Sequence, residues 1–134
     1  MFQFRIENIE ALKFQYALNE NDVSKIKPQI GVASIITLKG EELVAKLQVK
    51  TIEDVKNAFS LDAVVSGTFS LKGYADSKDE RDVLKRISIA TLYPYLRSYV
   101  SAVTSLLSDK KGVTLDIIDV EEIAKNAEFI AEEA

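Results

Sequence analysis

This 134-residue sequence contains no cysteine and no histidine. The absence of cysteine excludes disulfides and thiolate chemistry, and it suits a protein of a reducing compartment. The absence of histidine removes the most common general base near neutral pH and the usual partner of a nucleophilic serine. Metal sites built from cysteine or histidine are excluded as well. We therefore expect a protein that is not an enzyme and that uses no metal and no cofactor.

An excess of basic charge and a long apolar run are also missing. The chain has 17 Lys and Arg against 21 Asp and Glu, with a formal net charge of −4, and its basic residues are scattered. Because phosphate binding depends on clustered basic side chains, we expect no nucleic-acid partner. No stretch of about 18 consecutive apolar residues is present to insert into a membrane, and no charged segment followed by an apolar run marks an export signal. We expect a soluble, cytoplasmic protein.

The clearest helical pattern lies between Ala90 and Leu107. Apolar side chains recur there with the period of an amphipathic helix, at Leu92, Leu96, Tyr99, Val103 and Leu106. Pro94 removes one hydrogen bond from a helix interior and crowds the preceding turn, so the helix either kinks at about 90–93 or begins there. A wide apolar stripe on this helix needs to be covered.

Two capping boxes mark the starts of helices, at Ser77-Lys-Asp-Glu80 and at Asp119-Val-Glu-Glu122. The first predicts a long helix over about 78–108, continued or restarted around Pro94. The second predicts a shorter helix over about 120–132, with Ile123, Ala127 and Ile130 on one face. Between them we expect a short extended link, Val113 to Ile118.

Four stretches of the amino-terminal half alternate between apolar and polar residues, as strands with one covered face do. The first runs from Phe2 to Leu18 at even positions with a polar interruption at Asn8 and Glu10, which predicts a strand bent or bulged near Asn8. The second and third, 30–38 and 43–49, flank Lys39-Gly40 and predict a hairpin. The fourth, 59–71, has a small and polar opposite face, and Gly67 inside it indicates a bulge or a close approach of another backbone.

These patterns predict one α+β domain over residues 1–134. We expect a four-stranded antiparallel meander sheet over about 2–72, packed by the long kinked helix and joined by the shorter carboxyl-terminal helix. Apolar surface is left over after one subunit folds, which suggests either association between subunits or binding of apolar segments of other polypeptides.

Other groups of side chains have two interpretations each. The acidic residues after Asp119 suggest a cation site, but a solvated helix face with a cap at Asp119 explains them better than calcium binding does. Tyr93, Tyr95 and Tyr99 suggest a platform for stacking bases, but their helical spacing and the little basic charge beside them favour core and interface roles. Val23 and Ile26 are either anchors of a loop or part of a binding surface. The five glycines are dispersed, so they form no phosphate-binding loop.

Thr91-Leu-Tyr-Pro-Tyr-Leu-Arg-Ser-Tyr-Val100 resembles the start of the long helix in the SecB family of export chaperones. Phe59-Ser-Leu-Asp-Ala-Val-Val-Ser-Gly-Thr-Phe-Ser-Leu71 is similar to the last strand of that family, with its Gly-x-Phe-x-apolar ending. Phe2-Gln-Phe and Leu12-Lys-Phe14 match the opening strand in residue type only. The likeness covers nearly the whole chain, and the Tyr-Pro-Tyr-Leu-Arg segment carries most of its specificity.

The resemblance implies an ATP-independent holdase that binds unfolded or export-bound polypeptides and delivers them to the SecA motor of the Sec translocase. It also implies a homotetramer, a dimer of dimers with the long helices between the sheets. The client groove would be formed by Val23, Ile26, Ile30, Val32, Ile123, Ala127, Phe129 and Ile130. The oligomer interface would be formed by Tyr93, Leu96, Tyr99, Val100 and Val103.

Some family features are missing from this sequence. The Pro-rich segments usual after the long helix are replaced by residues 108–119. Asp62 matches one of the acids with which the family contacts SecA, whereas Ala11 and Gln15 stand where the first strand carries others. Two further readings therefore stay open: a dedicated SecB-like chaperone of a toxin–antitoxin system, with an antitoxin as its partner, and a small-ligand binding protein or enzyme on the same fold.

Overall fold

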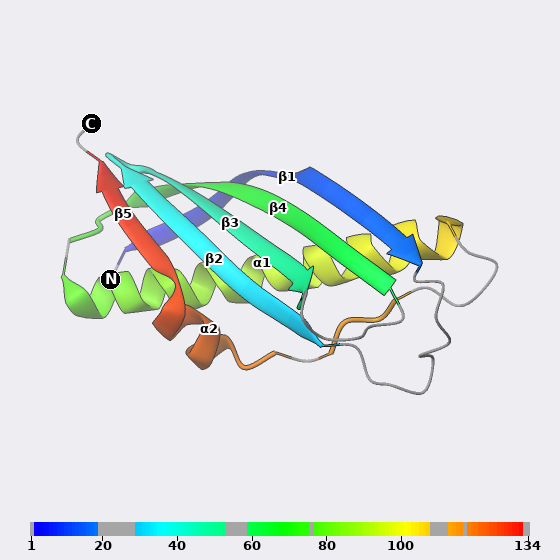
Figure 1. Ribbon diagram of the computed structural model, residues 1–134. Coiled ribbons are helices and arrows are strands. Elements are labelled where there is room, and N and C mark those ends of the chain that lie inside the picture. The colour runs from blue at the N-terminus through cyan, green and yellow to red at the C-terminus, as the bar shows by residue number, and fades with distance from the viewer. Residues whose placement is uncertain are drawn as a thin grey trace.

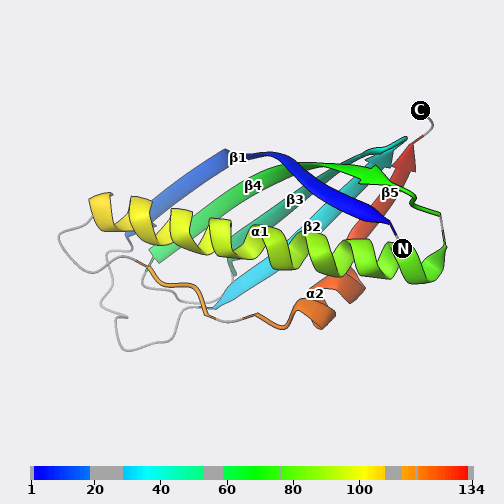
Figure 2. The same cartoon turned by 180° about the vertical axis from the view of Figure 1, so that it is seen from behind.

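A computed structural model describes residues 2–18, 29–52, 59–75, 77–107, 113–116 and 118–132. The architecture is α+β, with one mixed sheet and both helices on a single face of it (Figures 1 and 2). The elements are, in order, β1 (Gln3–Leu18), β2 (Ile30–Lys39), β3 (Glu42–Thr51), β4 (Phe59–Lys72), α1 (Lys78–Leu107), α2 (Val120–Asn126) and β5 (Glu128–Glu132).

The sheet has five strands in the order β1-β4-β3-β2-β5, not the predicted four-stranded meander. β2, β3 and β4 do form consecutive antiparallel pairs, but β1 lies beside β4 instead of beside β2. Alternation along a strand fixes which side chains face the core, and it leaves the choice of neighbour open. β1 is long enough to pair with β4 from Gln3↔Lys72 to Leu18↔Phe59.

β1 contains two bulges, which explain its polar interruption. The register with β4 shifts between Ile6 and Asn8 and again between Ala11 and Lys13. Each bulge reverses the side-chain phase, so Ile9, opposite Gly67, takes the core-facing position between them. The predicted irregularity near Asn8 is confirmed. Leu12 is the extra residue of the second bulge, and its side chain is 48% exposed instead of covered.

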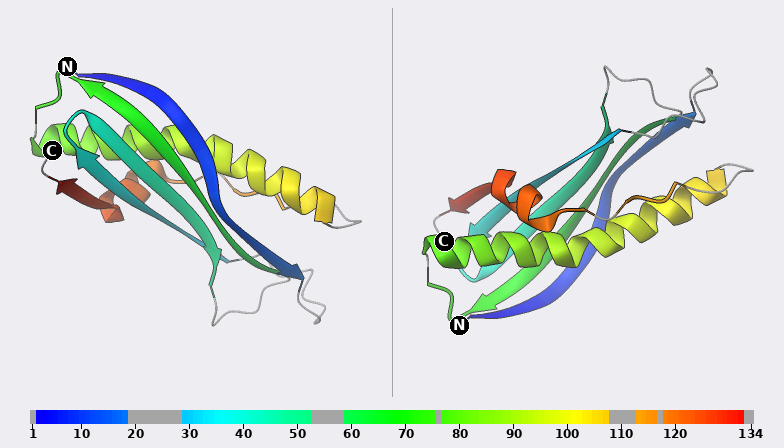
Figure 3. Two further views of the ribbon diagram at one scale, coloured as in Figure 1. Left: turned by 90° about the horizontal axis from the view of Figure 1, so that it is seen from above. Right: turned by 90° about the horizontal axis from the view of Figure 1, so that it is seen from below.

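α1 is one element of 30 residues with Pro94 inside it, so the alternative in which a helix begins at Pro94 is wrong. Figure 3 shows a continuous helix that curves gently along its length. Its predicted start is confirmed, because Glu80 N donates to Ser77 Oγ at 3.2 Å. The Glu80 carboxylate reaches back to the amide of Ala75, which donates to Glu80 Oε2 at 2.6 Å. No described helix is long and apolar enough to cross a membrane.

The core lies between α1 and the inner face of the sheet. Its fully buried helix side chains are Leu84, Ile89, Leu92, Leu96 and Val100. Gly67 of β4 packs tightly under α1, because an added Cβ would lie 2.7 Å from Leu92 Cδ2 and 2.8 Å from Phe69 Cζ. The space at Gly67 is thus limited by side chains, not by the bulge or the second backbone that the sequence predicted.

The carboxyl-terminal segment differs from the prediction of one helix over 120–132. Asp119 caps α2 as expected, with Glu122 N donating to Asp119 Oδ1 at 3.3 Å, but the helix ends at Asn126. Ala127 has extended backbone angles, and residues 128–132 form β5, which pairs in parallel with β2 from Ile35↔Glu128 to Lys39↔Glu132. The apolar pattern of so short a segment fits a helix and a strand equally well. The edge of β2 from Ile35 to Lys39 provides the partner that makes it a strand.

Candidate functional site: an apolar recess beside an open strand edge

An apolar recess of about 180 Å³ lies where β2 begins, between the sheet, α1 and the link after α1. Its lining residues are Ile30, Val32, Val49, Tyr93, Leu115, Asp116 and Ile118. Ile30 and Val32 are half-buried side chains on the inner face of β2, so they are accessible from the recess. The structure thus brings together two of the predicted groove residues with apolar side chains of the link.

Two hydroxyl groups of α1 hold the link in place. The buried hydroxyl of Thr104 donates to Val100 O at 2.6 Å and accepts a hydrogen bond from Val113 N at 2.7 Å. Nearer the middle of α1, the Tyr93 hydroxyl donates a hydrogen bond to Asp116 O. These bonds fix both ends of the described link segment, and Leu115 between them is almost fully buried. The wall of the recess is therefore anchored to the same helix that packs under the sheet.

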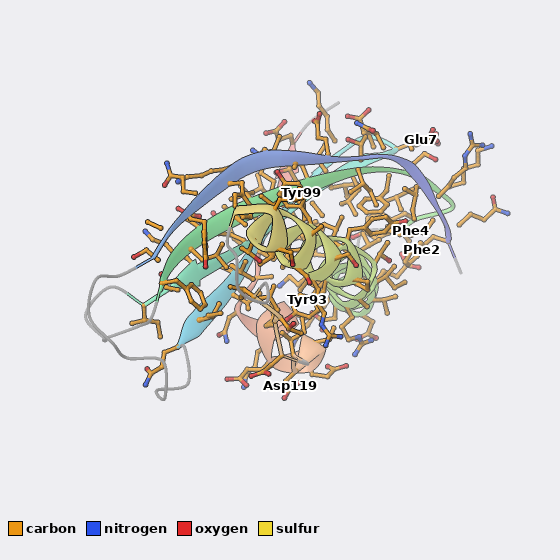
Figure 4. All side chains as sticks on the ribbon, turned by 90° about the vertical axis from the view of Figure 1, so that its right-hand side faces the viewer. Phe2, Phe4, Glu7, Tyr93, Tyr99 and Asp119 are labelled. Carbon is orange, nitrogen blue, oxygen red and sulfur yellow. The ribbon has the colours of Figure 1, made fainter. Side chains whose placement is uncertain are left out.

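Tyr93 and Tyr99 lie on different sides of α1. Figure 4 looks along the helix and shows Tyr99 toward β1 and β4 and Tyr93 toward α2. The Tyr99 ring contacts the ring of Phe14 edge to face at a centroid distance of 5.4 Å. Burial raises the pKa of the Tyr93 hydroxyl, and the charge of Asp116 raises it further against the opposing charge of Arg97. Tyr93 is therefore a protonated donor at neutral pH.

Beyond Ile30 and Val32, the groove residues that the structure describes do not form one surface. Val23 and Ile26 lie outside the described residues. Ala127 is buried, and Ile123 is half-buried against the core. Phe129 pairs with the buried Ile36, so it faces the helices, where the Arg81 guanidinium lies 4.9 Å from its ring centroid.

Ile130 occupies the opposite face of the sheet from Phe129. It pairs with Thr37, lies on the outer face with Ile35, and is 38% exposed. The predicted helix would have put Ile130 on the same face as Ile123 and Ala127. Because β5 is a strand, adjacent residues point to opposite sides, and Ile130 cannot contribute to a groove on the helix side.

Part of the predicted oligomer interface is buried within a single chain. Leu96 and Val100 have no exposed surface, and Tyr93 is 8% exposed, because all three pack between α1, the sheet and the link. These three side chains are therefore not available to another subunit. Tyr99 and Val103 are half-buried and remain at the margin of the helix.

The outward face of α1 is nearly uncharged over its second half. Between Ile87 and Leu107 the sequence has one charged residue, Arg97. Tyr95 is 51% exposed and Leu106 is 85% exposed on this helix, and the exposed residues between them are Arg97, Ser98, Ala102 and Ser105. An uncharged face with exposed large side chains is typical of a helix that packs against a further partner.

Asp62 does not present a free carboxylate for docking. It lies on the outer face of the sheet, where Lys13 Nζ is 2.7 Å from Asp62 Oδ2 and Gln48 Nε2 donates to Oδ1 at 2.8 Å. Its side chain is 11% exposed. The carboxylate already has partners from β1 and β3, so its expected role as a SecA contact is not supported by its surroundings.

Sequence reasoning missed the contribution of Leu115 and Ile118 to the recess. The sequence feature that could have indicated this contribution is the spacing of Val113 and Leu115, which lie two positions apart in an apolar segment. It predicts an extended segment with one buried side, but it does not identify the strand against which that side packs. Hydrophobic periodicity also could not predict the hydrogen bonds that the Tyr93 and Thr104 hydroxyls form with the link.

Neither a protein-family model nor a curated protein matches this chain. Several solved structures have a similar fold, among them the following two. One is a protein of unknown function from Streptococcus agalactiae, with 20% identity, a TM-score of 0.61, and coverage of 87% of this chain and 99% of that chain. The other is the Mycobacterium tuberculosis Rv1957 SecB-like chaperone in complex with a ChAD peptide from the Rv1956 HigA1 antitoxin, with 17% identity, a TM-score of 0.62, and coverage of 87% and 91%. The fold of this chain is therefore similar to that of a SecB-like chaperone.

Proposed function

We propose that this protein is a cytoplasmic, ATP-independent chaperone that holds apolar segments of unfolded polypeptides. The observation that carries the proposal is the apolar recess at Ile30 and Val32, beside a strand edge, on a fold similar to that of a SecB-like chaperone. The SecB-like neighbour was solved with a peptide bound, which supports a polypeptide as the ligand.

The proposed mechanism is differential binding. An unfolded chain exposes apolar side chains that the folded chain hides, so only the unfolded form can bury them in the recess. Each large side chain that is buried contributes about 1.5–3 kcal/mol. Several such contacts along one client, or on several subunits, give useful avidity without sequence specificity or nucleotide. Release then follows when the client folds or passes to another binder, such as the SecA motor.

The test is suppression of aggregation by the full chain without ATP, measured by light scattering for two unrelated proteins diluted from urea. We expect Val32→Asp to weaken suppression several-fold, because it places a charge in the apolar recess. Val44→Asp is the matched control, since it makes the same substitution at a half-buried valine on the outer face of β3, away from the recess. Circular dichroism must show both variants folded. Failure of the unmodified chain to suppress aggregation of either protein would refute the proposal.

A second candidate is a dedicated chaperone of one antitoxin. The specific observation in its favour is the antitoxin peptide in the M. tuberculosis SecB-like structure. The two candidates predict different selectivity. A general holdase suppresses aggregation of both test proteins, whereas a dedicated chaperone protects one short polypeptide encoded beside it and leaves the two test proteins unprotected.

We also propose that the chain assembles as a homotetramer, a dimer of dimers, through the outward face of α1, with Tyr99 and Val103 at its margin. The uncharged surface around Tyr95 and Leu106 supports this assembly. Sedimentation velocity should give a mass above the monomer that Leu106→Glu reduces, because a buried charge opposes association. Lys78→Glu at the exposed start of α1 is the control. A monomer at micromolar concentration would contradict the assembly.

A further inference from the structure

We propose that the edge of β2 from Ile30 to Ala33 binds an extended segment of an unfolded polypeptide as an added strand, whose alternate side chains enter the apolar recess. This inference rests on the proposed function and specifies how a client would be recognised. In this arrangement the client is held by backbone hydrogen bonds as well as by apolar contacts.

The hydrogen-bonding direction of β2 follows from its pairing with β3. Ile52 N donates to Gln29 O at 3.0 Å, so position 29 faces β3. In an antiparallel ladder, residues alternate between bonding to the partner and pointing away from it. The odd-numbered residues of β2 therefore bond to β3, and the N–H and C=O groups of Ile30 and Val32 point to the opposite edge.

That edge is covered over only half its length. β5 pairs with β2 beginning at Ile35↔Glu128 and continuing to Lys39. Among the described residues, no strand lies beside Ile30 to Ala33. Backbone groups in such a row act as a template for another extended chain. β5 shows that the same edge of β2 accepts a parallel strand a few residues further on.

Side-chain directions link the edge to the recess. Ile30 and Val32 face the inner side of the sheet and line the recess together with Tyr93 and Ile118. An added strand continues the sheet, so every second side chain of that strand points to the same inner side. The occupant is therefore an extended segment with apolar side chains at alternate positions. A helix or a small apolar molecule would leave the backbone groups of Ile30 and Val32 unpaired.

Backbone methylation of a synthetic peptide tests this pairing directly. The probe is a peptide of alternating valine and threonine with lysine at both ends, and two versions carry N-methyl groups on alternate residues in opposite phases. All versions keep the same side chains, but only one phase blocks the amides that would face β2. We expect that phase to bind at least about tenfold more weakly and the other phase to bind within about twofold of the unmethylated peptide. Equal affinity, or equal loss, for the two phases would overturn the added strand.

A protein variant provides the complementary test. Val32→Pro removes an N–H that points to the open edge and leaves the ladder with β3 intact, as proline does at sheet edges. Val32→Ala keeps that N–H and loses only apolar surface. We expect the proline variant to bind the peptide about tenfold more weakly than the alanine variant, and hydrogen exchange to show that the amides of Ile30 and Val32 become protected in the wild-type complex. Equal affinity of the two folded variants, or no new protection of these amides, would overturn the inference.

These outcomes separate the inference from the function on which it rests. If the unmethylated peptide does not bind and the chain does not suppress aggregation, the proposed function fails. If peptide binding and suppression occur but methylation phase has no effect, clients are held by side chains alone and only the added strand is refuted.

Discussion

Lys13 Nζ on β1 lies 2.7 Å from Asp62 Oδ2 on β4, and the same carboxylate accepts a hydrogen bond from Gln48 on β3. One acidic side chain thus connects three strands on the outer face of the sheet, the face without helices (Figure 3). Burial of Asp62 by itself raises the pKa of its carboxyl. The hydrogen bonds from Lys13 and Gln48 and nearby positive charge outweigh burial, so that the pKa lies below its ordinary value of 3.8.

The first prediction concerns stability in acid. Because the folded-state pKa of Asp62 is lowered, its contribution is complete above the unfolded-state value of 3.8 and is lost as the pH falls through the folded-state value. At neutral pH, Asp62→Asn should lower the free energy of unfolding by about 1–2 kcal/mol, since the partly exposed Lys13 loses its ion pair. Urea unfolding at neutral and acidic pH measures both effects.

The difference between wild type and Asp62→Asn should shrink as the pH falls below the ordinary aspartate range. Glu10→Gln on the exposed side of β1 is the control and should change the free energy of unfolding by less than about 0.5 kcal/mol. A constant difference between wild type and Asp62→Asn at all pH values would contradict the role assigned to the carboxylate.

The second prediction concerns Gly67, where α1 approaches β4. Gly67→Ala should destabilise the fold by about 1–3 kcal/mol, because the new methyl group would overlap Leu92 Cδ2 and the Phe69 ring. Gly31→Ala is the matched control, since the nearest atom there is Lys50 O at 3.8 Å. Adding Leu92→Ala should give a double variant whose loss is smaller than the sum of the single losses, measured by urea unfolding. Strict additivity would show that the two sites do not touch.

The third prediction concerns the anchor of the link. Thr104→Val has nearly the same shape but leaves the amide of Val113 without its acceptor, so the free energy of unfolding should fall by about 1–3 kcal/mol. Hydrogen exchange should accelerate at Val113, and Thr104→Ser should retain most of the protection. Ser105→Ala removes an exposed hydroxyl that bonds only to its own helix, and it should be close to neutral. Unchanged exchange at Val113 in Thr104→Val would refute the anchor.

The fourth prediction has the opposite sign. The hydroxyl of Ser88 is fully buried in α1 and has no hydrogen-bond partner among the described residues. Burying an unpaired hydroxyl is costly, so Ser88→Ala should leave stability unchanged or raise the free energy of unfolding by about 1 kcal/mol. Thermal unfolding measures the change. A marked loss of stability would mean that the hydroxyl has a partner.

Much of the fold followed from local pattern. Lys39-Gly40 between two alternating stretches predicts the hairpin, and the structure pairs Lys39 with Glu42 around a turn in which Gly40 has a φ of 61°. The capping residues Ser77 and Asp119 predict the helix starts in the same way, since a cap bonds to an amide three residues away. Such features depend on neighbours in sequence, which is why the sequence reveals them.

Features that depend on distant contacts were not accessible in this way. The placement of β1 beside β4 depends on competition between complete strands. The change from helix to strand after Asn126 depends on the free edge of β2 near Ile35. For the site, the resemblance to the SecB family identified Ile30 and Val32, but it also placed Leu96 and Val100 at a subunit interface. Within the single chain, these two side chains are already fully buried.

Among the strands that the structure describes, β5 alone runs parallel to its neighbour, and its pairing of Ile36 with Phe129 joins positions that are very far apart in the sequence. Such a contact has a large loop-closure cost until the rest of the chain is in place, and it offers few buried side chains in return. Docking of β5 should consequently be among the last events of refolding, and a fluorescent or NMR probe at Phe129 would acquire its native signal after probes in the β2–β3 hairpin.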